Sequence, residues 1–185
     1  MIKLKNLIQE IYDTNMLENQ QKYKIFCDLD GVLVGLDKGI KQLTGGLSFK
    51  DYTAAHSADD MFNLINNNGS IWWATLPWTD DGKSLWDFIQ DKNTTILTSG
   101  ATKRAGELAG EGKKEWCHKN LGATVPVIVV SKSVEKQQYA KPNHILIDDL
   151  DSNITQWKNK GGIAIHHKNT PDTLTQLKQL LNITN

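Results

Sequence analysis

Two aspartates stand two residues apart directly after a short apolar run, in the segment KIFCDLDGVLVG (24–35). The run Ile25-Phe26-Cys27 has the composition of a buried strand, and Asp28 and Asp30 follow it. Burial of an unpaired charge costs free energy, whereas a charge that meets a cation or a hydrogen-bonding partner is tolerated. The pair therefore predicts compensating groups elsewhere in the chain.

Two further apolar runs, 95–98 and 144–147, also lead into polar residues. These residues are Thr98, Ser99 and Gly100 at the first run and Asp148 and Asp149 at the second. Because the carboxyl ends of parallel strands meet at one edge of a sheet, we expect these groups to converge on the first aspartate pair. This convergence is a stronger signal than the two aspartates alone, which also suit a turn or a helix cap.

Four carboxylates near one point disfavour ionisation unless a cation is present. Mg²⁺ binds through carboxylates, water and substrate phosphate, and the predicted metal residues are Asp28, Asp30, Asp148 and Asp149. The Thr98 hydroxyl and the Ser99-Gly100 amides can bind phosphate oxygens at a helix start, and a lysine from VSKSVEKQQYAK (130–141) can balance the remaining negative charge. These are the groups that phosphoryl transfer through an aspartyl phosphate needs.

The elements that must position these groups alternate along the chain. Predicted strands cover 24–28, 95–98, 125–130, 144–147 and 162–166, and predicted helices cover 84–90, 105–120, 154–160 and 173–181. Alternation of nearly continuous apolar strands with helices predicts an α/β fold, in which a parallel sheet is covered by helices on both faces.

Two segments lack this alternation of strands and helices. Residues 36–90 are rich in polar and aromatic residues, and we interpret them as a small, mostly helical insertion between the first two strands. Residues 1–22 carry apolar residues at helical spacing and predict an amphipathic helix, which packs on the domain itself or docks a partner. The core then comprises 23–35 and 91–185.

Composition narrows the function classes. The 185 residues carry 21 basic and 21 acidic side chains, so the net charge is zero and gives no strong signal for binding nucleic acid. No run approaches the length of a membrane-spanning helix, and the N-terminus lacks the pattern of a signal peptide. The two cysteines, Cys27 and Cys117, fit buried free thiols in a reducing, cytoplasmic environment.

Four segments resemble the four motifs of the haloacid dehalogenase superfamily in order and spacing: DLDGV (28–32), ILTSG (96–100), a lysine near 136, and ILIDD (145–149). The resemblance extends from about Lys24 to His167. It implies a Rossmann-like, three-layer αβα core with a parallel sheet, and it makes the insertion at 36–90 a C1 cap.

Within the superfamily the sequence is most similar to the 5'(3')-deoxyribonucleotidase-like group. The similar features are Trp72-Trp73, Leu76-Pro77, the helix at 84–89 and the segment GKKEWCHKNLG (112–122). This resemblance implies a Mg²⁺-dependent 5'-nucleotidase acting on (deoxy)nucleoside monophosphates.

The resemblance also implies roles for individual residues. Asp28 would be the nucleophile, and Asp30 would be the general acid and then the base, with its carbonyl oxygen on Mg²⁺. Thr98 would bind phosphate, helped by Ser99 and Gly100, and Asp148 and Asp149 would hold the metal. Lys136 fits the remaining motif best by its distance from Asp148, while Lys132 and Lys141 stay open as alternatives.

The substrate is less constrained than the chemistry. Phe49, Trp72 and Trp73 could stack on a nucleobase, or they could form the core of the cap. The alternatives to a nucleotidase are a polynucleotide 3'-phosphatase, a phosphatase for a small sugar or amino-acid phosphate, and a non-catalytic binding protein. The preferred base and sugar, the position of the phosphate and a possible homodimer are not determined by the sequence.

Overall fold

The computed structural model describes residues 4–7, 23–100, 105 and 107–183. Its centre is a five-stranded sheet in the order β3-β2-β1-β4-β5, with every neighbouring pair parallel. The strands are β1 (Lys24–Cys27), β2 (Thr94–Ser99), β3 (Val127–Val130), β4 (His144–Asp148) and β5 (Ile163–His166). The predicted α/β class and parallel sheet are confirmed.

Eight α-helices and one 3-10 helix accompany the sheet in the part of the chain described after Tyr23. They are α2 (Leu36–Thr44), α3 (Phe49–Ala55), α4 (Ala58–Asn66), α5 (Gly69–Ala74), α6 (Gly82–Ile89), α8 (Leu108–Asn120), η1 (Ser133–Tyr139), α9 (Asp151–Asn159) and α10 (Thr170–Leu180). The predicted helices near 84–90, 105–120, 154–160 and 173–181 correspond to α6, α8, α9 and α10.

Alternate side chains of β1 face two separate apolar clusters. Ile25 and Cys27 belong to the larger cluster, together with buried residues of α6, α8 and α10. Phe26 points the other way and meets Trp157 of α9, with their ring centres 5.4 Å apart. Side chains two apart on a strand share a face, so the sheet is covered on both sides. This arrangement is the predicted three-layer αβα core.

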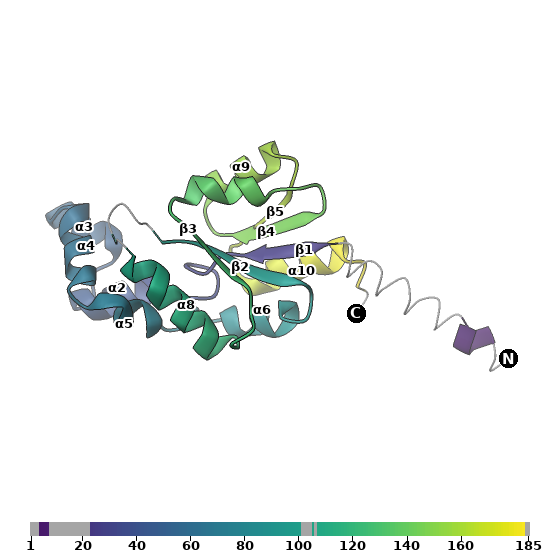
Figure 1. Ribbon diagram of the computed structural model, residues 1–185, viewed down its shortest axis with the longest axis horizontal. Helices are drawn as coiled ribbons and strands as arrows, with labels where there is room; N and C mark the ends of the chain where they lie inside the picture. Colours follow the sequence, from purple (N-terminus) through teal and green to yellow (C-terminus); the bar gives the residue numbers. More distant parts are fainter. Residues whose placement is uncertain (1–3, 8–22, 101–104, 106, 184–185) are drawn as a thin grey trace.

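The five helices between β1 and β2 lie in two different places. In Figure 1, α2 to α5 gather at the left end of the molecule, away from the middle of the sheet, whereas α6 lies near α10. Leu85 and Ile89 of α6 are fully buried in the larger cluster. The division into a cap at 36–90 and a core stays a prediction, and the last helix of that segment belongs to the layer against the sheet.

Short polar side chains cap the start of two helices of the insertion, α3 and α4. The Ser57 hydroxyl accepts a hydrogen bond from the Asp60 N–H, while the Asp60 carboxylate accepts one from the Ser57 N–H. This reciprocal capping box satisfies two N–H groups that have no partner within the helix. Ser48 accepts a bond from the Asp51 N–H at the start of α3 in a similar way.

A glycine lets α5 approach α8 closely. A Cβ atom at Gly112 of α8 would lie 2.2 Å from the main-chain oxygen of Ser70 and 2.5 Å from the Cβ of Trp73. Contacts this short do not occur between real atoms, so the separation of the two helices depends on glycine at this position.

Most of the predicted N-terminal helix (1–22) lies outside the described residues. Residues 4–7 are helical, and their side chains, including Leu4 and Leu7, are exposed. No helix in the described part of the chain is both long and apolar enough to cross a membrane.

Candidate active site

Three adjacent strand ends form the site. β1 lies between β2 and β4, and the Asp28 N–H, just after β1, donates to the carbonyl oxygen of Ile147 at 2.9 Å. Asp28 and Asp148 are therefore neighbours across two paired strands. β2 brings Thr98 to the other side of β1. The predicted convergence of the polar strand ends is what the structure shows.

A carboxylate cluster occupies this edge. One oxygen from each of Asp28, Asp148 and Asp149 lies within 4.8 Å of the others. Asp28 is 5% exposed and Asp148 is fully buried. Asp148 accepts hydrogen bonds from the Leu150 N–H at 3.0 Å and from the Asn153 side chain at 2.9 Å. These donors hold the carboxylate in place at the start of α9.

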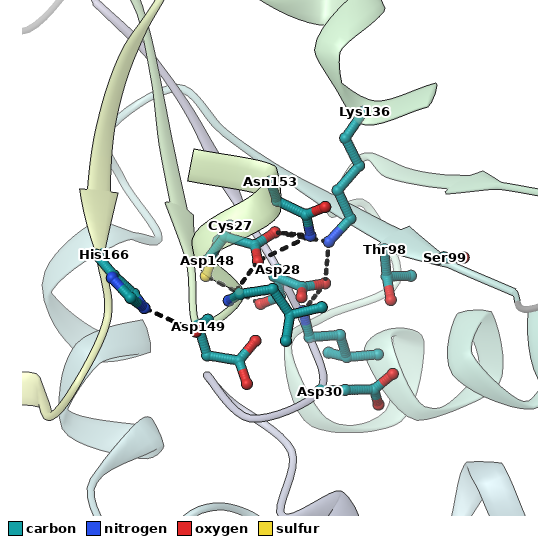
Figure 2. Close-up of polar contacts among 12 residues, drawn as sticks. Cys27, Asp28, Asp30, Thr98, Ser99, Lys136, Asp148, Asp149, Asn153 and His166 are labelled. Atoms are coloured by element: carbon teal, nitrogen blue, oxygen red, sulfur yellow. Dashed lines mark hydrogen bonds and ion pairs between the residues drawn. The ribbon is translucent and has the colours of Figure 1, made fainter. Parts of the chain in front are cut away.

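Lys136 connects the cluster from η1. Its buried ammonium lies 2.8 Å from Asp28 Oδ1 and 2.7 Å from Asp148 Oδ2 (Figure 2). Burial lowers the pKa of Lys136, but the negative charges of Asp28 and Asp148 outweigh it and raise the pKa above its ordinary value. Of the three candidate lysines, Lys136 is the one at the carboxylates, since Lys132 and Lys141 are exposed.

Asp149 completes the cluster beside a tight turn. Gly31 has a φ of +75°, and a Cβ atom there would lie 2.3 Å from Asp149 Oδ2. Burial, followed by the charges of Asp28 and Asp148, raises the pKa of Asp149 to about 7. Three oxygen ligands with mutual repulsion suit a hard divalent cation, which would relieve that repulsion. Asp28, Asp148 and Asp149 therefore fit Mg²⁺.

Asp30 stands apart from these three carboxylates and pairs with a different lysine. In Figure 2 its side chain lies away from Lys136. Lys113 of α8 donates to Asp30 Oδ2 at 2.5 Å and to the Ser99 carbonyl oxygen at 2.6 Å, with Thr98 Oγ1 at 3.4 Å. As a metal residue, Asp30 could act only through its main-chain carbonyl, as the resemblance implies.

Lys113 is a site residue that the sequence reasoning missed. It is 3% exposed, and the buried residues of α8 are Ala109, Gly112, Lys113, Trp116 and Cys117. These positions recur every three or four residues and so mark the buried face of the helix. A lysine on that stripe requires a buried partner, and this was the signal in the segment 112–122.

The predicted phosphate-binding residues are not equally placed. Thr98 is fully buried beside Lys113, and Ser99 lines the cavity next to Asp28. The Gly100 N–H instead donates to the Val130 carbonyl oxygen at 2.8 Å and so extends the ladder between β2 and β3. The sheet therefore engages the Gly100 amide in this arrangement, and phosphate binding by Gly100 stays a prediction.

A cavity of about 330 Å³ opens next to the carboxylates. Its lining residues are Asp28, Asp30, Gly31, Leu36, Asp37, Ile40, Phe49, Ser99, Ser133, Lys136, Asp149 and Leu150. Phe49 thus lines the cavity, and its contact with substrate stays a prediction. A larger groove of about 820 Å³ lies between α6 and α10, but none of the site carboxylates lines it.

Trp72 and Trp73 do not line the cavity beside Asp28. Trp73 is buried, and Trp72 packs edge-on against it, with ring centres 4.8 Å apart. The interpretation that they form the core of the cap fits this geometry better than stacking on a nucleobase.

The two cysteines are buried and unpaired, as predicted. Burial and the nearby charge of Asp28 raise the pKa of the Cys27 thiol well above its ordinary value. Because the thiolate is the reactive form, Cys27 is a core residue rather than a second nucleophile.

No family model matches the sequence, and no curated protein matches it. Solved structures do. A hydrolase from Streptococcus pneumoniae TIGR4 is 13% identical, with 87% of this chain and 98% of that chain covered and a TM-score of 0.52. A Had-superfamily hydrolase from Ehrlichia chaffeensis is 17% identical, with 86% and 97% covered and a TM-score of 0.48.

A haloacid dehalogenase-like family hydrolase from Streptococcus pneumoniae is 15% identical, with 78% of this chain and 84% of that chain covered and a TM-score of 0.47. At these identities the first of the three similarities establishes the fold alone. The activity has to be argued from the site.

Proposed function

We propose that this chain is a Mg²⁺-dependent phosphomonoester hydrolase of the haloacid dehalogenase type, which transfers a phosphoryl group first to Asp28 and then to water. The observation that carries the proposal is the position of Asp28, a buried carboxylate at a strand end that opens on a cavity. Lys136 holds it, and two further carboxylates stand close enough to share a cation with it.

The first step is attack by Asp28 on phosphorus. Asp28 Oδ1 already accepts bonds from Lys136 and from the Leu29 N–H at 2.8 Å, so we assign Oδ2 as the attacking atom. A bond forms between Oδ2 and phosphorus, and the bond from phosphorus to the alcohol oxygen breaks. Asp30 donates a proton to that oxygen, and the alcohol leaves.

The second step restores the enzyme. Asp30, now a carboxylate, accepts a proton from water while the water oxygen attacks phosphorus. The bond between phosphorus and Asp28 Oδ2 breaks, which yields inorganic phosphate and regenerates the Asp28 carboxylate. Separate partners for Asp28 and Asp30 support this division of roles, since nucleophile and acid–base group need different environments.

The residues that would hold Mg²⁺ are Asp28, Asp148 and Asp149, with the Asp30 carbonyl as a further predicted ligand. When bound, the ion supplies positive charge that offsets these carboxylates and the phosphoryl oxygens. Lys136 orients Asp28, and Thr98 and Lys113 offer a hydroxyl and an ammonium at the opposite side of β1. Positioned donors of this kind stabilise the charge that develops on transferring oxygens.

We propose a nucleoside 5'-monophosphate, in the ribo or deoxyribo form, as the substrate. The cavity volume of about 330 Å³ falls in the range of small-molecule sites. Leu36, Ile40, Phe49 and Leu150 give it an apolar wall, and an aromatic ring such as Phe49 can stack on a nucleobase. A cytoplasmic location and a homodimer remain predictions.

The test is phosphate release from nucleoside 5'- and 3'-monophosphates, sugar phosphates and 3'-phosphorylated oligonucleotides, with Mg²⁺ and with EDTA. We expect release from 5'-monophosphates that needs Mg²⁺ and is lost in Asp28→Asn. Asp80→Asn makes the same change at a carboxylate that is 95% exposed and serves as the control.

Two results would change the conclusion. Release from oligonucleotides alone would replace the nucleotidase by an end-processing phosphatase. Release that survives in Asp28→Asn would remove Asp28 as the nucleophile.

A further inference from the structure

The ammonium of Lys113 rests on the face of an indole ring. Lys113 Nζ lies 5.0 Å from the centre of the Trp73 ring, and both side chains are 3% exposed. Asp30, Ser99 and Thr98 contact the same ammonium through oxygen atoms. The ring attracts a cation that lies over its face, so Trp73 adds a fourth contact.

The buried position of Trp73 is unfavourable in free energy for one of its groups, the indole N–H. Among the described residues, no hydrogen-bond acceptor meets its buried Nε1–H. A buried donor without a partner is unfavourable, and a phenylalanine would occupy an apolar site without that penalty. Tryptophan offers the strongest cation-binding face of the aromatic residues. Its presence here is explained if the face of the ring, rather than its N–H, is what the site uses.

The ring is also held firmly. Trp72 packs against it nearly at right angles, with an angle of 84° between the ring planes. The absence of a side chain at Gly112 leaves room for the Trp73 Cβ. Gly112 is the residue before Lys113, so the close contact of α5 with α8 and the position of the ammonium are set together.

We propose that Trp73 is a positioning residue, which fixes the Lys113 ammonium against Asp30 and so couples α5 to proton transfer in the active site. The catalytic consequence rests on the proposed function, in which Asp30 protonates the leaving alcohol. Without the indole face, the long Lys113 side chain loses one of the contacts that hold it, and Asp30 loses a fixed partner.

The first test compares two leaving groups in Trp73→Leu and Trp73→Phe. A nucleoside leaves as an alkoxide and needs a proton from Asp30, whereas the nitrophenolate of p-nitrophenyl phosphate needs little help. We expect kcat/KM for the nucleotide, which reports only the steps up to departure of the leaving group, to fall about 10-fold more than kcat/KM for the aryl ester in Trp73→Leu, with a smaller difference in Trp73→Phe. Trp86→Phe, a buried tryptophan on α6, controls for the loss of an indole.

Equal losses of kcat/KM on the two substrates, or a loss for the nucleotide that lies in KM alone, would overturn the proposal, because a purely structural or substrate-binding role predicts them. If Trp73→Leu does not fold, Trp73→Phe carries the same comparison. The effect should also vanish in a Lys113→Met background, where the ring has no ammonium to hold.

The second test does not depend on activity. The thermal midpoints of Trp73→Leu, Lys113→Met and the double variant form a cycle, in which residues that contact each other give non-additive changes. We expect the double variant to lose less than the two single variants together. Strict additivity would refute the contact even if phosphatase activity is present. Absence of phosphate release in the wild type with a non-additive cycle would instead refute the proposed function.

Discussion

Two buried lysines flank the strand end that carries Asp28 and Asp30, and different elements of the fold hold them in place. Lys136 comes from η1 and meets Asp28 and Asp148, which are both fixed by neighbouring strands. Lys113 comes from α8 and meets Asp30, with a tryptophan of α5 under it. The first lysine is held by the sheet edge, whereas the second also depends on a helix of the insertion.

This difference separates what each lysine can do. The Lys136 ammonium lies between two strand ends, so its position is fixed as long as the sheet is intact. A partner with a fixed position suits a nucleophile such as Asp28. The position of an ammonium that rests partly on α5 changes when that helix shifts, so the partner of Asp30 depends on the packing of α5. Changes in α5 should therefore affect Asp30 and leave Asp28 in place.

The largest effect is expected from Lys136→Met, which leaves two buried carboxylates without their cation. Removal of one partner from a buried ion pair costs about 3–5 kcal/mol, so both stability and phosphate release should be lost. Urea unfolding and phosphate release measure the two. Lys132→Met, at an exposed lysine of the same segment, is the control. An unchanged midpoint for Lys136→Met would show that the pair is not formed in solution.

A smaller effect is expected from Lys113→Met, because the Asp30 side chain is 23% exposed and water can replace part of the contact. Phosphate release from a nucleotide should fall about 100-fold, as when acid–base catalysis is lost, while the unfolding midpoint falls less than in Lys136→Met. Lys114→Met changes the exposed neighbour and should behave as the wild type. Equal losses of stability at Lys113 and Lys136 would remove the distinction between the two lysines.

Gly112→Ala tests the dependence on α5 without touching a charge. The added methyl group would meet the Ser70 carbonyl oxygen, and relief of such overpacking costs about 1–3 kcal/mol. The variant should lose activity toward nucleotides more than toward p-nitrophenyl phosphate, and its Mg²⁺ affinity should stay unchanged in calorimetry. Gly110→Ala, where the nearest atom is 3.4 Å away, is the control. Weakened Mg²⁺ binding in Gly112→Ala would show that the two halves of the site are not separable.

The smallest expected effect is the pH dependence of the stability of the metal-free protein. Burial and the charges of Asp28 and Asp148 raise the pKa of Asp149 from 3.8 to about 7. Between these values the folded state binds the proton more tightly than the unfolded state, so this group makes the metal-free protein less stable as pH rises. Asp149→Asn should therefore raise the thermal midpoint in EDTA at pH 8 by a few degrees.

The wild type should then gain stability from Mg²⁺, and the variant should gain less, because ligands that bind the folded state stabilise it. Asp151→Asn, at a carboxylate that is 84% exposed, is the control. A lower midpoint for Asp149→Asn in EDTA would contradict the predicted repulsion.

The part of the site built by strand ends could be predicted from the sequence. Apolar runs mark buried strands, and Asp28, Thr98 and Asp148 follow or end such runs within a few residues. Lys136 was preferred over its neighbours by spacing alone, and it is the lysine at the carboxylates. These inferences needed only local patterns and the rule that parallel strand ends share an edge.

The part built by helix packing could not be predicted in the same way. Lys113 reaches Asp30 across 83 positions of sequence, and nothing local to either residue indicates that partner. For Trp73 the sequence leaves two positions open, contact with substrate and the core of the cap, because an aromatic residue in a cap suits both. Its position follows from the contact of α5 with α8, which a short motif does not encode.

The strand order also has a consequence for how the chain folds during synthesis. Of the five strands that the structure describes, β1 is made first, and it occupies the middle of the sheet, where Phe26 pairs with Thr95 on one side and Leu146 on the other. At typical ribosomal rates, roughly 6 to 24 s separate the synthesis of Phe26 from that of Leu146.

During that time an apolar strand lacks one of its two neighbours, and pairings this distant along the chain form slowly. The predicted nucleophile at its end is therefore translated well before Lys136 and Asp148, which surround it in the folded chain. A nascent chain that stops before η1 holds Asp28 without Lys136 or Asp148, so the surroundings of the reactive carboxylate are complete only after β4 has been made.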